Sequence, residues 1–175
     1  MATALALALR LFRIGHQSLW IDEVFTWLSA AIHQPYGWRD VLSDLHGPLY
    51  SALLHAWGAV AGDSEWALRL PSAVFGALAV PGFAWLAARW LGDDAAAPAA
   101  WLAAGSPFLV WYGQEARNYA MLIACVVFSA ALLLERARAG APATAGWIAA
   151  SLAGMTSNLT FAFVLPVELR WALAG

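Results

Sequence analysis

The sequence predicts an all-α fold: a polytopic transmembrane helix bundle with amphipathic juxtamembrane helices in its first outer loop. Hydrophobic residues make up 62% of the 175 residues and charged residues only 11%, with a mean hydropathy of +0.66, well outside the balance of soluble domains. Several apolar segments approach the roughly 20 residues that cross a bilayer. Eleven tryptophans suit repeated membrane–water crossings, because the indole ring is apolar with one polar N–H.

Six segments are expected to span the membrane. The clearest is 67–90, in which Pro71 and Pro81 are tolerable because a packed bundle satisfies the freed backbone groups. The first segment is too short for a whole span, and the chain stops directly after an apolar segment, so we expect the N-terminal part of a longer protein. The expected spans are about 1–15, 67–90, 95–112, 118–135, 144–156 and 159–174.

A polar, aromatic-rich outer loop, residues 16–66, separates the first two spans and holds all four histidines. Within it, 22–33 resembles a short amphipathic helix lying on the membrane. A second surface helix is expected at 48–61, because proline suits a first helical turn. The positive-inside rule alone prefers that 48–61 span the membrane. We favour the surface placement, because it keeps Asp22 and Arg117 on one side.

Charge and cysteine content narrow the functional classes. A net charge of −2 gives no reason to expect a nucleic-acid partner. The single cysteine, Cys125, lies in an apolar segment, so a disulfide framework within the chain is impossible. We interpret it as a small packed or lipid-facing side chain.

The acidic dipeptide Asp22-Glu23 stands between long apolar segments, where charged groups are costly and tend to be functional. Aspartate is also a common helix cap, and an acid in a first helical turn is favoured by the helix dipole. For Asp22 we favour a catalytic role over capping. For Glu23 the two interpretations stay open.

Four blocks then follow in order: SLWIDEVFTW, HGPLYSALLHAW, SEWALRLPSAVFGALAVPG and SPFLVWYGQEARNYAM. Together they resemble the GT-C superfamily of membrane glycosyltransferases, nearest to the dolichyl-phosphate-mannose–protein mannosyltransferases and the bacterial aminoarabinose-transferase-like enzymes. The resemblance covers roughly residues 10–135. It implies inverting transfer of a sugar from a polyprenyl-phosphate donor, at a site on the extracytoplasmic side of a bacterial plasma membrane. The implied acceptor is a protein, a lipid or a glycan.

The resemblance also assigns residues. The family's acidic pair falls on Asp22 and Glu23. Its HPPL-type element falls on His46 to Leu49, with Gly47 in place of the commoner proline. Further family positions fall on the following substrate-binding candidates: His46, Arg69, Glu115, Arg117 and Tyr119, the last three in an element that begins at Gln114.

The chemistry of such a transfer fits these residue types. Asp22 is suited to act as the base that takes a proton from the acceptor hydroxyl. Arg69 or Arg117 is suited to hold the departing phosphate in a forked geometry, although Arg117 beside Glu115 also fits a simple ion pair. A divalent cation stays an open alternative, because acids and histidines share one loop but lack tight ligand spacing.

Two other classes compete with the enzyme. In a transporter or channel, Asp22, Glu115 and Arg117 would line an ion path, and such acids are expected near mid-membrane in broken helices. These residues instead lie at the ends of apolar segments. In a non-catalytic membrane scaffold, their gathering would be accidental.

Overall fold

The computed structural model describes residues 1–30, 41 and 47–174, and over these residues every regular element is helical. The all-α class is therefore confirmed for that part of the chain. The elements are α1 (Ala2–Leu11), α2 (Ile21–Ser29), α4 (Pro48–Ala61), α5 (Glu65–Leu91), η1 (Asp93–Ala95), α6 (Ala96–Gly105), α7 (Pro107–Gly113), α8 (Tyr119–Ala139), α9 (Ala141–Ser157), η2 (Leu159–Phe163) and α10 (Leu165–Ala174).

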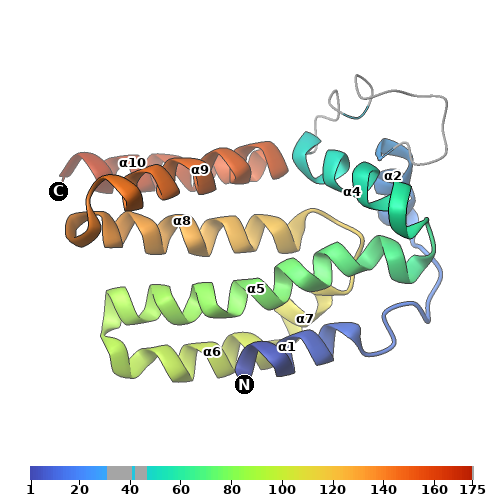
Figure 1. Ribbon diagram of the computed structural model, residues 1–175, viewed down its shortest axis with the longest axis horizontal. Coiled ribbons are helices and arrows are strands. Elements are labelled where there is room, and N and C mark those ends of the chain that lie inside the picture. Colours follow the sequence, from blue (N-terminus) through green and yellow to red (C-terminus); the bar gives the residue numbers. More distant parts are fainter. Residues whose placement is uncertain (31–40, 42–46, 175) are drawn as a thin grey trace.

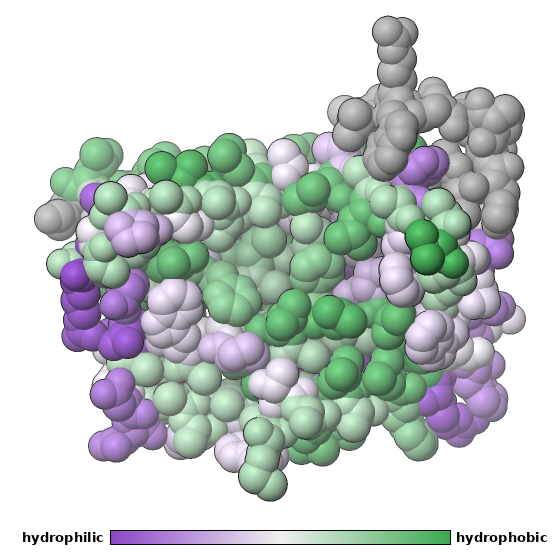
Figure 2. Space-filling model, viewed as in Figure 1, coloured by the Kyte–Doolittle hydropathy of each residue, from purple (hydrophilic) through white to green (hydrophobic). Residues whose placement is uncertain are grey.

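The long helices lie side by side, and α2 and α4 gather at one end of them (Figure 1). Helix α5 packs against α1, α6 and α8, and α8 packs against α9. The loop between α7 and α8 reaches the same end as α2 and α4. Figure 2 shows hydrophilic residues at the two ends of the visible face and mostly hydrophobic residues between them. This distribution suits a bundle whose sides meet lipid.

Over the described residues, two helices are long and apolar enough to cross a membrane, Glu65–Leu91 and Tyr119–Ala139. Helix α5 contains Pro71 and Pro81 without a break. It begins where the Ser64 hydroxyl accepts a hydrogen bond from the Ala67 N–H (3.3 Å), which satisfies one of the unpaired donors of the first turn.

Several boundaries differ from the sequence-based expectation. Segment 95–112 forms two helices, α6 and α7, because Ser106 caps α7 and Pro107 begins it. Segment 159–174 likewise divides into η2 and α10, after Asn158 accepts a hydrogen bond from the Thr160 N–H. Helix α2 ends at Ser29, and residues 31–33 of the expected surface helix lie outside the described residues.

Polar side chains also fix the bundle internally. Glu168 of α10 accepts hydrogen bonds from Ser129 of α8 and from Trp147 and Ser151 of α9. Arg10 of α1 is fully buried and donates to the Ala6 carbonyl. A Cβ added to Gly76 of α5 would lie 2.6 Å from the Arg10 Nε. Glycine there lets α1 and α5 approach closely around the arginine.

Candidate active site

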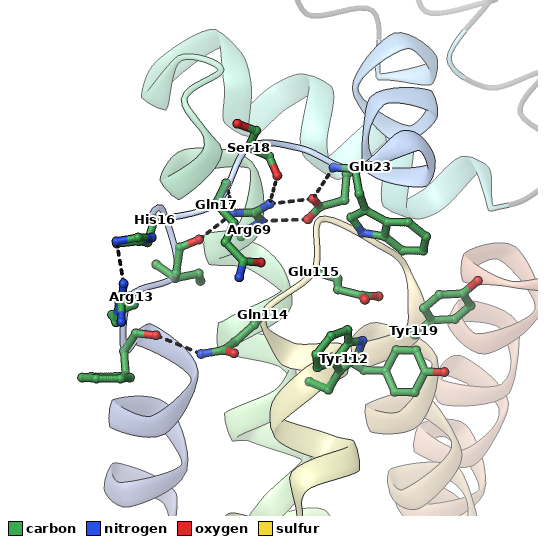
Figure 3. Close-up of a pocket in the computed structure, with 14 residues that line it drawn as sticks. Arg13, His16, Gln17, Ser18, Glu23, Arg69, Tyr112, Gln114, Glu115 and Tyr119 are labelled. Atoms are coloured by element: carbon green, nitrogen blue, oxygen red, sulfur yellow. Dashed lines mark hydrogen bonds and ion pairs between the residues drawn. The ribbon is translucent and has the colours of Figure 1, made fainter.

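A buried ion pair, Glu23 with Arg69, forms the centre of the polar end of the bundle. Arg69 Nε lies 2.8 Å from Glu23 Oε1, and Arg69 Nη2 lies 2.6 Å from Glu23 Oε2. Glu23 also accepts from the backbone N–H groups of Ala116 (2.7 Å) and Trp20 (3.3 Å). The glutamate has no exposed surface and the arginine is 5% exposed. Both carboxylate oxygens are thus occupied by donors of the protein itself (Figure 3).

The guanidinium of Arg69 uses all five of its N–H groups within the chain. Beyond the two bonds to Glu23, Nη1 donates to the carbonyls of Ile14 and Gln17, each at 2.8 Å, and Nη2 donates to that of Ser18 (3.2 Å). An arginine offers five donors in all. A lipid phosphate at Arg69 would have to displace these partners, so the geometry suits a residue that holds the segment after α1.

Asp22 faces a different environment from its neighbour. Successive helical residues are rotated by about 100°, and while Glu23 points inward, Asp22 lines a smaller cavity of about 290 Å³. The residue that caps α2 is Trp20, not Asp22, so capping does not explain the aspartate. Among the described residues no hydrogen bond or ion pair occupies its carboxylate.

Arg117 holds the first turn of α2 in place. Its Nη1 donates to the Asp22 carbonyl (3.1 Å) and to the Thr26 hydroxyl (3.0 Å). Its Nη2 lies 3.4 Å from the Tyr119 hydroxyl, and its Cζ lies 5.3 Å from the centroid of that ring. The buried Nε has no hydrogen-bond partner among the described residues. Arg117 therefore does not form the ion pair with Glu115 that its sequence position suggests.

The loop between α7 and α8 carries Glu115 and Arg117, leads to Tyr119 at the start of α8, and is fixed at both ends. Gln114 donates to the Leu9 and Phe12 carbonyls at the end of α1, each at 3.0 Å. At the other end, the Asn118 side chain donates to the Ser157 carbonyl of α9 (2.8 Å). These contacts bring the ends of helices α1 and α9 to the same site.

A larger cavity of about 730 Å³ lies beside the ion pair (Figure 3). Glu115, which lines it, is 8% exposed, and its Oε2 has no hydrogen-bond partner in the described structure. Burial raises the pKa of the Glu115 carboxyl above its usual value. The cavity is lined by Phe12, Arg13, Ile14, His16, Gln17, Ser18, Trp20, Glu23, Arg69, Trp111, Tyr112, Gln114, Glu115 and Tyr119.

The two cavities are neighbours. Asp22 and Glu23, consecutive in α2, line one each, and the Tyr119 hydroxyl at the larger cavity bonds to Arg117 at the smaller one. Asp22, Glu23, Arg69, Glu115, Arg117 and Tyr119 thus come together from three parts of the chain. His46 lies outside the described residues. Within the described part of the chain, no three histidine, cysteine or acidic side chains are placed to hold a metal ion.

Sequence reasoning missed a second layer of the site. The Tyr50 hydroxyl of α4 lies 2.7 Å from the Ser72 hydroxyl of α5, which donates to the Arg117 carbonyl (2.9 Å). Burial raises the pKa of the Tyr50 phenol. Because Ser72 gives its single proton to Arg117, Tyr50 is the donor to Ser72. Tyr50 follows directly after the HGPL block, but nothing in its spacing indicated this contact.

The backbone at residue 47 explains why this chain has glycine where proline is the commoner residue. Its φ is +153°, and a Cβ at this position would lie 1.9 Å from the Ser157 carbonyl oxygen. Proline holds φ near −65°, so this backbone excludes it. The glycine is thus required by the contact between the start of α4 and the end of α9.

Comparison with known families agrees with this architecture. Residues 45–175 match the model of a family described as dolichyl-phosphate-mannose-protein mannosyltransferase. The chain belongs to this family. Membership indicates a membrane glycosyltransferase of the GT-C type, and the family consists of integral membrane proteins. No curated protein and no solved structure matched the chain. The match begins after Asp22 and Glu23, so the roles of these two residues depend on the geometry.

Proposed function

We propose that the chain carries the active site of a membrane glycosyltransferase that moves a sugar, with inversion, from a polyprenyl-phosphate donor to an extracytoplasmic acceptor. In this proposal the helices cross a bacterial plasma membrane as a polytopic bundle, with α2 and α4 on the outer surface. The acceptor is a hydroxyl group on a protein, a lipid or a glycan.

One observation carries the proposal: the two adjacent carboxylates have unequal hydrogen bonding and face two adjoining cavities. Glu23 accepts four N–H groups, whereas the carboxylate of Asp22 has no partner among the described residues. A general base needs an oxygen within reach of the substrate proton. Asp22 meets this condition and Glu23 does not.

The two cavities suit the geometry of a one-step inversion, in which the acceptor attacks from the side opposite the leaving group. We assign the larger cavity to the donor and the smaller one, with Asp22, to the acceptor. Asp22 takes the proton of the acceptor hydroxyl while the oxygen of that hydroxyl bonds to the anomeric carbon. The bond from that carbon to the phosphate oxygen breaks, and polyprenyl phosphate leaves with the electron pair. A single base with no covalent intermediate distinguishes this reaction from retaining hydrolysis.

The other predicted residues receive supporting roles. Arg69 and Glu23 position the segment that carries Asp22, and Arg117 positions the first turn of α2 through the Asp22 carbonyl. Glu115 and Tyr119 line the donor cavity. For His46 we retain the prediction of substrate binding from the sequence.

The proposal is tested by replacing Asp22 with asparagine, which keeps the shape but cannot accept a proton at neutral pH. Initial rates of sugar transfer from dolichyl-phosphate-mannose, measured for the full-length protein in lipid, should fall roughly a hundredfold or more. Donor binding on the same preparation should persist. The matched control is Asp94→Asn, an exposed aspartate in η1 at the opposite end of the bundle, which should leave the rate unchanged. Near wild-type turnover by Asp22→Asn would refute the assignment.

A further inference from the structure

The polar groups around the larger cavity are arranged with a guanidinium and an imidazole on one side and a carboxylate nearer the other. Arg13 and His16, from the segment after α1, lie across the cavity from Tyr112 and Tyr119, with Glu115 between them (Figure 3). Glu23 is already neutralised by Arg69. The carboxylate of Glu115 is therefore the acid on the cavity wall that lacks a cationic partner in the described structure.

Arg13 is held in an unusual way. Its φ is +55°, a left-handed conformation that is uncommon for residues other than glycine and tends to persist at functional sites. Its side chain is exposed, and Nη2 lies 2.5 Å from Nε2 of His16. No carboxylate of the described residues pairs with it. An imidazole carries no negative charge, so this contact leaves the guanidinium its charge and most of its N–H donors.

The two arginines that line this cavity differ in capacity. Arg69 donates all five of its N–H groups to the protein, whereas Arg13 makes one hydrogen bond to the described residues, the one to His16. A planar guanidinium with open donors is well suited to bind phosphate by two parallel hydrogen bonds. The phosphate of a donor in this cavity therefore has Arg13 as its available cation.

The other part of the cavity suits a sugar. The Oε2 of Glu115 is buried and has no hydrogen-bond partner among the described residues, and a buried polar atom without a partner is costly unless a ligand or water satisfies it. The rings of Tyr112 and Tyr119 stand beside it in an edge-to-face pair, with centroids 5.0 Å apart. A carboxylate oxygen accepts hydrogen bonds from hydroxyl groups, and the aromatic rings offer apolar surface to the C–H face of a sugar.

We propose that the larger cavity is the glycosyl-phosphate subsite, in which Arg13 together with His16 binds the donor phosphate and Glu115 accepts a hydrogen bond from a sugar hydroxyl. This inference rests on the proposed function and adds the residues that recognise each half of the donor. It moves the phosphate contact to Arg13 from Arg69 or Arg117, the two candidates that the sequence offered.

The test compares two ligands, dolichyl phosphate and dolichyl-phosphate-mannose, by equilibrium binding to the full-length protein in lipid nanodiscs. Arg13→Gln should weaken both ligands alike, by roughly 10- to 100-fold for the loss of a charged hydrogen bond. Arg13→Lys should recover part of that affinity, because it restores the charge without the fork. Glu115→Gln should weaken dolichyl-phosphate-mannose and leave dolichyl phosphate unchanged.

The controls are Arg138→Gln, an exposed arginine in the last turn of α8, and Asp94→Asn, both at the opposite end of the bundle. Equal affinities in Arg13→Gln and Arg138→Gln would show that Arg13 does not bind phosphate. Equal losses for both ligands in Glu115→Gln would show that Glu115 does not contact the sugar. If the wild-type protein binds neither lipid, the donor class itself is wrong, and the proposed function fails with it.

Discussion

Replacement of Arg69 by methionine should strongly destabilise the protein. Arg69→Met removes the five hydrogen bonds that the guanidinium makes and leaves the fully buried Glu23 without its counter-ion. Breaking a buried pair from one side costs about 3–5 kcal/mol, because the remaining charge is uncompensated. At roughly 2–4 °C per kcal/mol for a chain of this size, the midpoint of thermal unfolding should fall by about 6–20 °C.

Helix α5 supplies its own control for this experiment. Arg89, near its other end, forms an ion pair with Glu135 of α8, but those side chains are 27% and 19% exposed. Arg89→Met should cost about 1 kcal/mol or less, because water screens a partly exposed pair. Midpoints are followed by tryptophan fluorescence of the full-length protein in detergent. Equal losses in Arg69→Met and Arg89→Met would refute the reasoning.

A second variant separates the charge from the lost packing. Glu23→Gln added to Arg69→Met removes the uncompensated charge and keeps an oxygen that can accept from the Ala116 N–H. The double variant should therefore be more stable than Arg69→Met alone, a coupling that a double-mutant cycle measures directly. Simple addition of the two single losses would contradict the buried-charge argument.

Three further predictions concern other positions. Because the pKa of Glu115 is raised in the folded protein, the folded state holds more protons than the unfolded state above pH 4.5, and the free energy of unfolding should fall as pH rises from that value through the folded pKa. Glu115→Gln should flatten this part of a Tm–pH profile. An unchanged slope in Glu115→Gln would contradict the assignment. Gly47→Pro should lower the unfolding midpoint, although it restores the family's commoner residue, because proline cannot adopt φ of +153°; an unchanged midpoint would contradict the backbone argument. Gly76→Ala should lower the free energy of unfolding by about 1–3 kcal/mol, because the added methyl group crowds the Arg10 side chain. The control is Gly105→Ala, whose added Cβ meets no atom within 4 Å and which should leave the unfolding midpoint unlowered.

The helical class and the family could be predicted from the sequence because both depend on local patterns. Apolar segments indicated α5 and α8, and the proline after Gly47 indicated the start of α4 at residue 48. The break between α6 and α7 was missed, although the Ser106-Pro107 pair that causes it is visible in the sequence. A long hydrophobic stretch masked the signal of a helix end followed by a new cap.

The partners within the site could not be predicted, because they depend on contacts between distant segments. Arg69 heads a long helix in the sequence, which suggested a ligand, yet its partners are Glu23 and three carbonyls of the segment after α1. Arg13 lies in none of the sequence blocks that pointed to the site. Its position on the cavity wall follows from the path of the chain between α1 and α2.

The different roles proposed for Asp22 and Glu23 follow from helix geometry and from the number of hydrogen bonds that each carboxylate accepts. A rotation of about 100° per residue turns Glu23 toward Arg69 while Asp22 faces the smaller cavity. The ion pair accounts for two hydrogen bonds of each residue; backbone carbonyls take the other three donors of Arg69, and the backbone N–H groups of Trp20 and Ala116 occupy the rest of Glu23. In the proposed reaction Glu23 is therefore not the base and Arg69 is not the phosphate ligand. What the pair provides is a rigid frame one residue away from Asp22. In the proposed reaction, the base is the carboxylate beside that frame that has no partner among the described residues, Asp22 in the smaller cavity, and the phosphate ligand is Arg13 in the larger one, whose contact with His16 leaves most of its donors open.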